Sequence, residues 1–69
     1  MAASAEPVDY DAILRRDLGY CHICGKPVHP DELHFDHVIP LARGGAHSTE
    51  NISVAHAICN LRKGTSLPS

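Results

Sequence analysis

Long apolar segments are missing from this sequence, and so is any sign of export. No stretch approaches the roughly 20 apolar residues that a membrane-spanning helix needs, which argues against a membrane protein. Residues 1–7 combine neither a basic start nor an apolar run, so we expect no secretory signal peptide. We therefore expect a soluble, cytoplasmic protein with no membrane partner.

Cysteine is too scarce for a disulfide framework, because three cysteines cannot all pair with one another. A chain of 69 residues also buries little apolar surface, and such chains usually need disulfides, a structural metal or oligomerisation. Three cysteines and one well-placed histidine would suit a tetrahedral zinc site. That interpretation implies a reducing compartment, where thiols stay free to bind metal.

Strong positive charge is absent as well, and the net charge of −2 does not by itself indicate a nucleic-acid-binding protein. The distribution is uneven. Residues 1–36 hold seven acidic and three basic residues, whereas residues 37–69 hold one acidic and three basic residues. The basic surplus therefore lies in the half that carries the candidate site below, although ordinary surface scatter remains an alternative explanation.

The turn-forming and apolar residues divide the chain into short elements. A helix is predicted from the N-cap Asp9 to Gly19, with an apolar stripe of Tyr10, Ile13, Leu14 and Leu18 that should pack in the core. Strands are predicted over residues 33–39 and 52–54, a polar loop over 40–50, and a helix over 55–63 ended by Gly64. We expect one domain over residues 9–64, with flexible ends at 1–8 and 65–69.

Two pairs of potential metal ligands share the same two-residue gap. Cys21 and Cys24 form the first pair, and His56 and Cys59 form the second, giving the pattern Cys-x2-Cys-x31-His-x2-Cys. Residues 56 and 59 would lie on one face of the predicted helix, so their side chains can converge. The pattern predicts one structural zinc site, with a spacer much longer than that of a DNA-reading ββα finger.

Two alternatives bear on this zinc site. The three cysteines could instead be small buried apolar residues, but two matched pairs in so short a chain argue against that. His22 is also available in place of His56 as the fourth ligand. Because His22 lies between the two cysteines of the first pair, its side chain should point away from the metal.

The second half of the chain resembles the signature of the HNH endonuclease family. The resemblance rests on the segments Asp36-His-Val-Ile-Pro40, Gly44-Gly45, Asn51-Ile52 and Cys59-Asn-Leu-Arg-Lys-Gly64, in the family's order. It extends from Cys21 to Gly64. It implies a small α+β domain with a zinc-stapled ββα-metal, treble-clef-like fold, here preceded by an N-terminal helix, and one divalent ion between the hairpin and the last helix.

The resemblance also implies a role for each motif residue. His37 is the general base, and Asp36 and Asn60 hold the catalytic ion. Asn51 holds the hairpin loop and orients the base. Phosphodiester hydrolysis needs such a base to activate water and a cation to offset the growing negative charge. Arg43, Arg62 and Lys63 are candidates for contacts to flanking DNA phosphates.

This sequence departs from many family members at two positions. Asn60 stands where histidine is common, which favours Mg²⁺ or Mn²⁺ over softer ions. His56 replaces one of four zinc-binding cysteines. In a regular strand Asp36 and His37 would also point to opposite faces, so we expect local irregularity near Val38 or Ile39.

The sequence therefore predicts a metal-dependent DNA endonuclease with low sequence specificity. A non-catalytic zinc module that binds DNA or a protein is the alternative, and Asp36 and His37 would then be an ordinary polar pair at a strand end. Asn51 would only cap a turn, and Lys63 would complement the helix dipole. The resemblance suggests a bacterial or phage origin, and a larger complex such as phage packaging machinery; the oligomeric state does not follow from the sequence.

Overall fold

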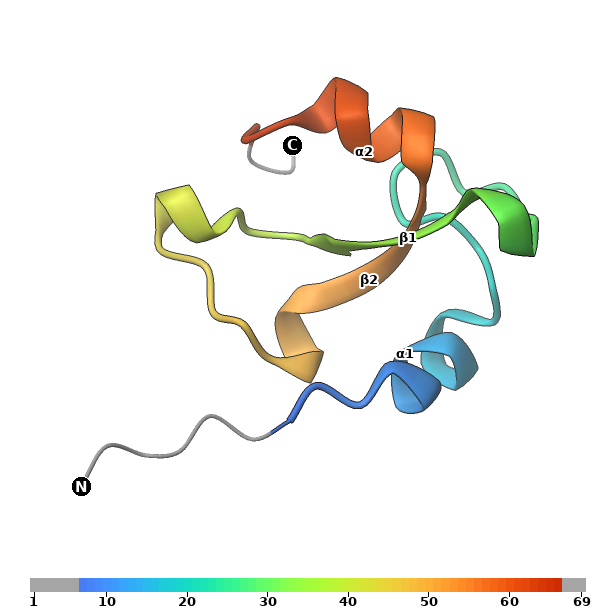
Figure 1. Cartoon of the computed structure of the whole chain (residues 1–69), viewed down its shortest axis with the longest axis horizontal. Coiled ribbons are helices and arrows are strands. Elements are labelled where there is room, and N and C mark those ends of the chain that lie inside the picture. Colours follow the sequence, from blue (N-terminus) through green and yellow to red (C-terminus); the bar gives the residue numbers. More distant parts are fainter. Residues whose placement is uncertain (1–6, 67–69) are drawn as a thin grey trace.

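The computed structural model describes residues 7–66 and contains a two-stranded antiparallel hairpin with one helix on each side (Figure 1). The main elements are α1 (Tyr10–Asp17), β1 (Leu33–His37), β2 (Ile52–His56) and α2 (Ala57–Lys63), with 3-10 turns at Pro30–Glu32, Leu41–Arg43 and Thr49–Asn51. The predicted small α+β class is confirmed. Of the flexible ends predicted at residues 1–8 and 65–69, residues 1–6 and 67–69 lie outside the described residues. Between residues 7 and 66, no helix combines the length and apolarity needed to cross a membrane.

The hairpin separates an apolar side from a polar side. In its register Leu33 faces His56 and His37 faces Ile52, so side chains alternate between the two faces along each strand. The core lies toward α1 and consists of the buried Ile13, Ile52 and Val54, with Val8, Leu14, Val28, Leu33 and Phe35 packed around them. The polar side, which carries the buried Asp36, lies beneath α2.

Helix α1 begins and ends close to the predicted positions. Asp9 caps it, because its Oδ1 accepts a hydrogen bond of 3.0 Å from the backbone N–H of Ala12. The prediction that Leu18 packs in the core is wrong: Leu18 is 75% exposed. The helix ends at Asp17, and Leu18 adopts the left-handed conformation with φ of 56°, which takes its side chain off the buried stripe.

The end of α1 is attached to β2 by polar contacts. Asp17 forms an ion pair of 2.7 Å with Arg16 and accepts a hydrogen bond of 2.9 Å from the backbone N–H of Val54. Arg16 in turn donates to the backbone oxygens of Thr49 and Ile52. The hydrogen bond from Arg16 holds the pKa of Asp17 below its ordinary value of 3.8, so this carboxylate stabilises the fold above that value and loses its effect as the pH falls below it.

Replacing Asp17 by asparagine should lower the free energy of unfolding by about 1–3 kcal/mol at pH 7, because two charge-assisted contacts are lost. Urea denaturation of the zinc-loaded protein measures this directly. Asp31→Asn removes the same charge from a side chain that is 90% exposed and should change stability by less than about 0.5 kcal/mol. Equal effects of the two substitutions would contradict the anchoring role of Asp17.

Both strands end at residues other than those predicted. Strand β1 stops at His37 instead of Ile39, and β2 continues to His56 instead of Val54. Pairing of Ala55 and His56 with β1 outweighs the helix propensity of alanine, so α2 starts only at Ala57. His56 therefore lies at the junction of strand and helix, and the prediction that it belongs to the helix is wrong.

Candidate metal centres and active site

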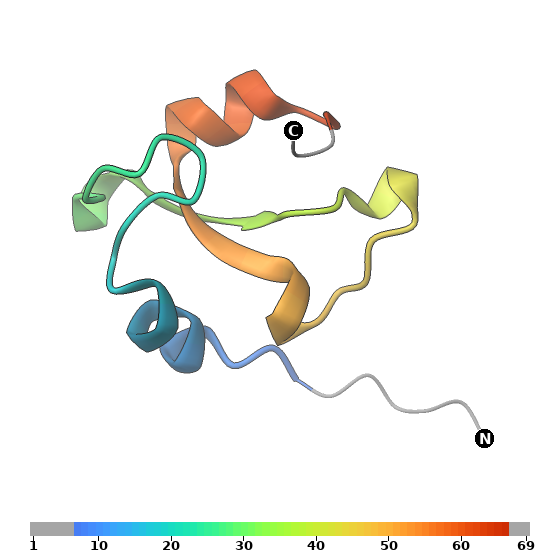
Figure 2. The same cartoon turned by 180° about the vertical axis from the view of Figure 1, so that it is seen from behind.

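Cys21, Cys24, His56 and Cys59 converge at the end of the hairpin where α2 begins. One ligand atom from each residue lies within 4.8 Å of the other three. The first two come from a tight turn closed by a 2.8 Å hydrogen bond from the backbone N–H of Gly25 to the oxygen of Cys21. Seen from behind, this turn lies beside the start of α2 (Figure 2). Ligand atoms around a tetrahedral zinc ion are separated by roughly 3.3–3.8 Å, so the cluster could hold zinc after small shifts of its side chains.

The orientation of His56 makes it the fourth member of this cluster. Its Nδ1 lies 3.3 Å from the sulfur of Cys24 and 3.9 Å from that of Cys59. Its Nε2 lies 3.0 Å from the backbone oxygen of Pro27. Zinc-bound histidines generally donate their second ring N–H in this way, which fixes the ring and the tautomer. His22 points elsewhere, as the sequence predicted.

The pKa values of two thiols of the cluster, Cys21 and Cys59, indicate that a bound cation would be needed to ionise both. Burial raises the pKa of Cys21, but hydrogen bonds from the backbone N–H groups of Cys24, His56 and Ile23 outweigh it and lower that pKa to about 6. Burial and the neighbouring sulfurs of Cys24 and Cys21 raise the pKa of Cys59 to about 11. The cluster is therefore prepared to hold one thiolate at Cys21, and Cys59 ionises only when a cation compensates its charge.

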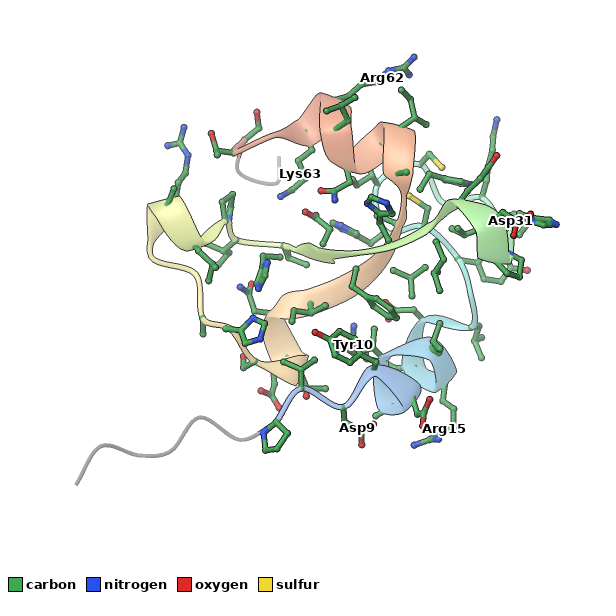
Figure 3. The ribbon with its side chains drawn as sticks, viewed as in Figure 1. Asp9, Tyr10, Arg15, Asp31, Arg62 and Lys63 are labelled. Carbon is green, nitrogen blue, oxygen red and sulfur yellow. The ribbon has the colours of Figure 1, made fainter. Side chains whose placement is uncertain are left out.

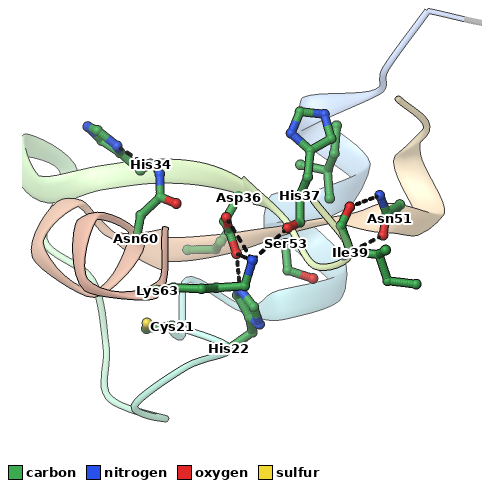
Figure 4. Close-up of polar contacts among 12 residues, drawn as sticks. Cys21, His22, His34, Asp36, His37, Ile39, Asn51, Ser53, Asn60 and Lys63 are labelled. Atoms are coloured by element: carbon green, nitrogen blue, oxygen red, sulfur yellow. Dashed lines mark hydrogen bonds and ion pairs between the residues drawn. The ribbon is translucent and has the colours of Figure 1, made fainter. Parts of the chain in front are cut away.

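Asp36 is the one charged residue in residues 7–66 that is almost fully buried, with 5% of its surface exposed. Its Oδ2 lies 2.8 Å from Nε2 of His22 and 3.2 Å from Nζ of Lys63 (Figure 4). A buried carboxylate is costly unless it is paired and hydrogen-bonded. Here an imidazole from the first cysteine turn and an ammonium group from α2 both meet that requirement.

Lys63 points into the protein, whereas Arg62 extends from α2 into solvent (Figure 3). The Lys63 side chain is 9% exposed, and its Nζ donates a 2.9 Å hydrogen bond to the backbone oxygen of His37. The prediction of a flanking phosphate contact for Lys63 therefore does not fit its position beside Asp36. Arg62 is exposed, and Arg43 uses its Nε to donate to the oxygen of Thr65 at 2.7 Å.

His37, the last residue of β1, contacts a second histidine. Its Nε2 lies 2.9 Å from Nδ1 of His47, which comes from the loop between the strands. The two rings are tilted by 40° with centroids 5.1 Å apart. One ring nitrogen of His37 is thus held by the loop, in the arrangement of a base and its orienting partner.

Asn51 fixes the backbone that follows His37. Its Oδ1 accepts from the N–H of Ile39 at 2.9 Å, and its Nδ2 donates to the oxygens of Ile39 and Ala46 at 2.9 and 2.7 Å (Figure 4). One side chain therefore joins both sides of the loop. The chain bends at Val38 and Ile39, directly after β1, as the sequence predicted.

Gly45 leaves room for this arrangement, because a Cβ atom there would overlap the backbone carbonyl of Ile39 and approach Nδ2 of Asn51 to 2.9 Å. Gly45→Ala should push the loop off Asn51 and expose the Ile39 amide to hydrogen exchange, with a cost of about 1–3 kcal/mol. Gly44→Ala is the control: its φ of 86° makes the substitution strained, but its Cβ meets nothing within 4 Å. Unchanged Ile39 protection in Gly45→Ala would contradict the role assigned to Asn51.

Asn60 lies on the same side of the hairpin as Asp36, in α2. Its Nδ2 is 3.4 Å from Nδ1 of His34, and both residues line a shallow hollow together with Ala57, Leu61 and Gly64. The two predicted ion ligands therefore lie on the side of the hairpin that α2 covers. Asn60 contacts His34, whereas Asp36 contacts His22 and Lys63.

A small ββα domain with a cluster that could hold zinc is the class that this fold and these residues define. A family model described as HNH endonuclease matches residues 21–66, and the chain belongs to the HNH endonuclease family. Members of this family are generally nucleases that act on DNA. A search of curated proteins finds no match.

Two residues of the site had no assigned role in the sequence prediction. His22 was considered only as a substitute zinc ligand, and its contact with Asp36 joins positions 14 residues apart. The sequence also did not indicate that His47 would contact His37. The one signal for His22 was its place inside the cysteine turn, which excluded it from the zinc cluster without indicating what it faces.

Proposed function

We propose that this protein is a divalent-metal-dependent DNA endonuclease that hydrolyses phosphodiester bonds with low sequence specificity. The proposal rests on the arrangement of the residues at the end of β1. There, Asp36 is buried beneath α2, His37 follows it directly, and Asn51 fixes the next backbone segment. Such rigid support is what an active site needs, because small misplacements of reacting groups cost large factors in rate.

In this proposal His37 takes a proton from the attacking water, and His47 orients the ring through Nε2. Histidine is the side chain best suited to this role near neutral pH. Asn51 keeps His37 at a fixed position relative to Asp36 by holding the loop on both sides. Hydrolysis of this type leaves a 5′-phosphate and a 3′-hydroxyl.

The donor set beneath α2 suits a hard divalent ion such as Mg²⁺ or Mn²⁺, with the carboxylate of Asp36 and the amide oxygen of Asn60 as ligands. When bound, the ion would offset the negative charge that develops on the scissile phosphate and the leaving oxygen. Lys63 forms an ion pair with Asp36 and holds its carboxylate in place. Arg62 and Arg43 would contact flanking phosphates.

The low specificity follows from the size of the domain. Sequence recognition requires side chains that reach the base edges of DNA over a sizeable interface. Of the predicted contacts, Arg62 and Arg43 would reach phosphates, and Lys63 forms an ion pair with Asp36. Contacts to phosphates fix the protein on the duplex without distinguishing sequences.

Nicking of supercoiled plasmid by the zinc-loaded protein tests the proposal. We expect open-circle product with Mg²⁺ or Mn²⁺ and none when the ion is omitted. Asn60→Ala should lower the rate at least about tenfold, and raising the ion concentration should restore part of it. Binding of DNA without cutting under all of these conditions would refute the proposal.

A non-catalytic zinc module is the second candidate, and one observation favours it. Asp36 already has two partners, Lys63 and His22, as expected of a carboxylate whose only role is to hold α2 on the hairpin. In that case Asp36→Asn would destabilise the fold, and neither Mg²⁺ nor Mn²⁺ would bind to the zinc-loaded protein. Calorimetric titration with Mn²⁺ separates the two candidates.

A further inference from the structure

We infer that His22 is a third protein ligand of the divalent ion, beside Asp36 and Asn60. This inference rests on the proposed function, because it adds a ligand to the same site. It starts from a contact that the zinc cluster does not explain. His22 lies between Cys21 and Cys24, but its ring turns away from their sulfurs and ends 2.8 Å from the buried carboxylate of Asp36.

The spacing of the two groups fits shared coordination. Neighbouring ligands of an octahedral ion with bonds of 2.0–2.1 Å lie about 2.9 Å apart. The distance from Nε2 of His22 to Oδ2 of Asp36 is 2.8 Å. The ring and the carboxylate therefore already have the separation that two adjacent ligands of Mg²⁺ or Mn²⁺ adopt.

The backbone holds His22 in place as a metal ligand should be held. Its N–H donates a 2.9 Å hydrogen bond to the oxygen of Val54 in the centre of β2. Its neighbour Cys21 is one of the four residues of the zinc cluster. The His22 side chain is 22% exposed, compared with 6% for Asp36, so solvent reaches the pair from the His22 side.

This assignment links the two metal sites through one turn of the chain. A zinc ion bound to Cys21 and Cys24 would also fix His22, which lies between them. His22 in turn faces the carboxylate of Asp36. An imidazole ligand further shifts the preference of the site. Nitrogen donors favour Mn²⁺, Co²⁺ and Ni²⁺ over Mg²⁺, so the site should bind Mn²⁺ more tightly than an all-oxygen site would.

Pulsed electron paramagnetic resonance of Mn²⁺ bound to the zinc-loaded protein tests the inference without measuring activity. We expect nitrogen modulation from a coordinated imidazole in the wild type. It should vanish in His22→Ala, together with about tenfold weaker Mn²⁺ binding. His22→Gln keeps an N–H donor toward Asp36 and should also lose the imidazole signal, which separates coordination from a hydrogen bond that merely orients the carboxylate.

Two controls complete the experiment. Ile23→Ala changes the neighbouring exposed residue of the same turn and should keep both the zinc content and the nitrogen signal. His34→Ala removes the histidine beside Asn60 and should keep the signal as well. A nitrogen signal that survives in both His22 variants, or that disappears only in His34→Ala, would overturn the inference.

The outcome is distinguishable from failure of the proposed function. If Mn²⁺ binds with the nitrogen of His22 but plasmid is not cut, only the nuclease proposal fails. If plasmid is cut and the signal does not depend on His22, only the ligand assignment fails.

Discussion

Removing zinc from the cluster of Cys21, Cys24, His56 and Cys59 is expected to unfold the protein. Only three large apolar side chains of the core cluster, those of Ile13, Ile52 and Val54, are fully buried. Short chains bury too little surface to be stable on that basis alone. Zinc binding in comparable small domains supplies on the order of 10 kcal/mol of folding free energy, as much as the entire stability of a typical domain.

A strong chelator should therefore abolish the helical circular dichroism and the dispersion of the amide spectrum, and added Zn²⁺ should restore both. Cys21→Ser should have the same effect without a chelator, because Cys21 is the most buried of the three thiols. Ile23→Ser, in the same turn, should stay folded with one zinc ion per chain. A cooperative, stable fold without zinc would contradict this account.

Replacing His37 by alanine is expected to reduce the rate of DNA cutting by about 10²–10⁴-fold, the contribution of a positioned general base. The fold should tolerate the change, because the side chain hydrogen-bonds only to His47 among the described residues and is not part of the apolar core. The melting temperature of the zinc-loaded variant should therefore stay close to that of the wild type.

His29→Ala serves as the matched control. It removes a histidine that is 68% exposed and lies in the turn before β1, so neither activity nor metal content should change. His47→Ala should lower the rate less than His37→Ala does, because it removes only the orienting partner. If His37→Ala cuts plasmid at the wild-type rate, His37 is not the base.

The residues that the sequence identified correctly are those whose relations depend on local spacing. A gap of two residues brings Cys21 and Cys24 to one centre, and the same gap works for His56 and Cys59 even though His56 ends a strand instead of entering a helix. The cap of α1 and the burial of Ile13 were predicted for a similar reason, because both are properties of one short segment. Leu18, beyond the end of the helix, is exposed instead.

The relations that the sequence missed join distant segments. The contacts of Asp36 with His22 and Lys63 depend on how the cysteine turn and α2 settle against the hairpin, and no spacing rule describes that packing. Lys63 was expected to contact a flanking phosphate, but its ammonium group lies beside Asp36 and the backbone oxygen of His37. The bend at Val38 and Ile39 was anticipated, but it begins after His37. Asp36 and His37 both remain within β1 and lie at alternating positions of the strand.

The two proposed metal sites have different roles: one would stabilise the fold, and the other would take part in catalysis. Zinc would hold the turn, the hairpin and α2 together, and the second ion would bind beneath α2 on residues that those elements supply. Loss of zinc should therefore abolish activity through loss of the fold. Loss of Asn60 or His22 should weaken binding of the second ion while leaving the zinc content unchanged.

End-group analysis of cut DNA is a direct test of metal-dependent endonuclease activity in this protein. Plasmid is incubated with the zinc-loaded protein and Mn²⁺, and the nicked circles are then treated with DNA ligase, which seals only a 5′-phosphate beside a 3′-hydroxyl. We predict that the wild type produces nicked circles that ligase reseals, and that His37→Ala produces almost none. Absence of nicking by the wild type, or nicks that ligase cannot seal, would contradict the assignment of this protein as a metal-dependent endonuclease.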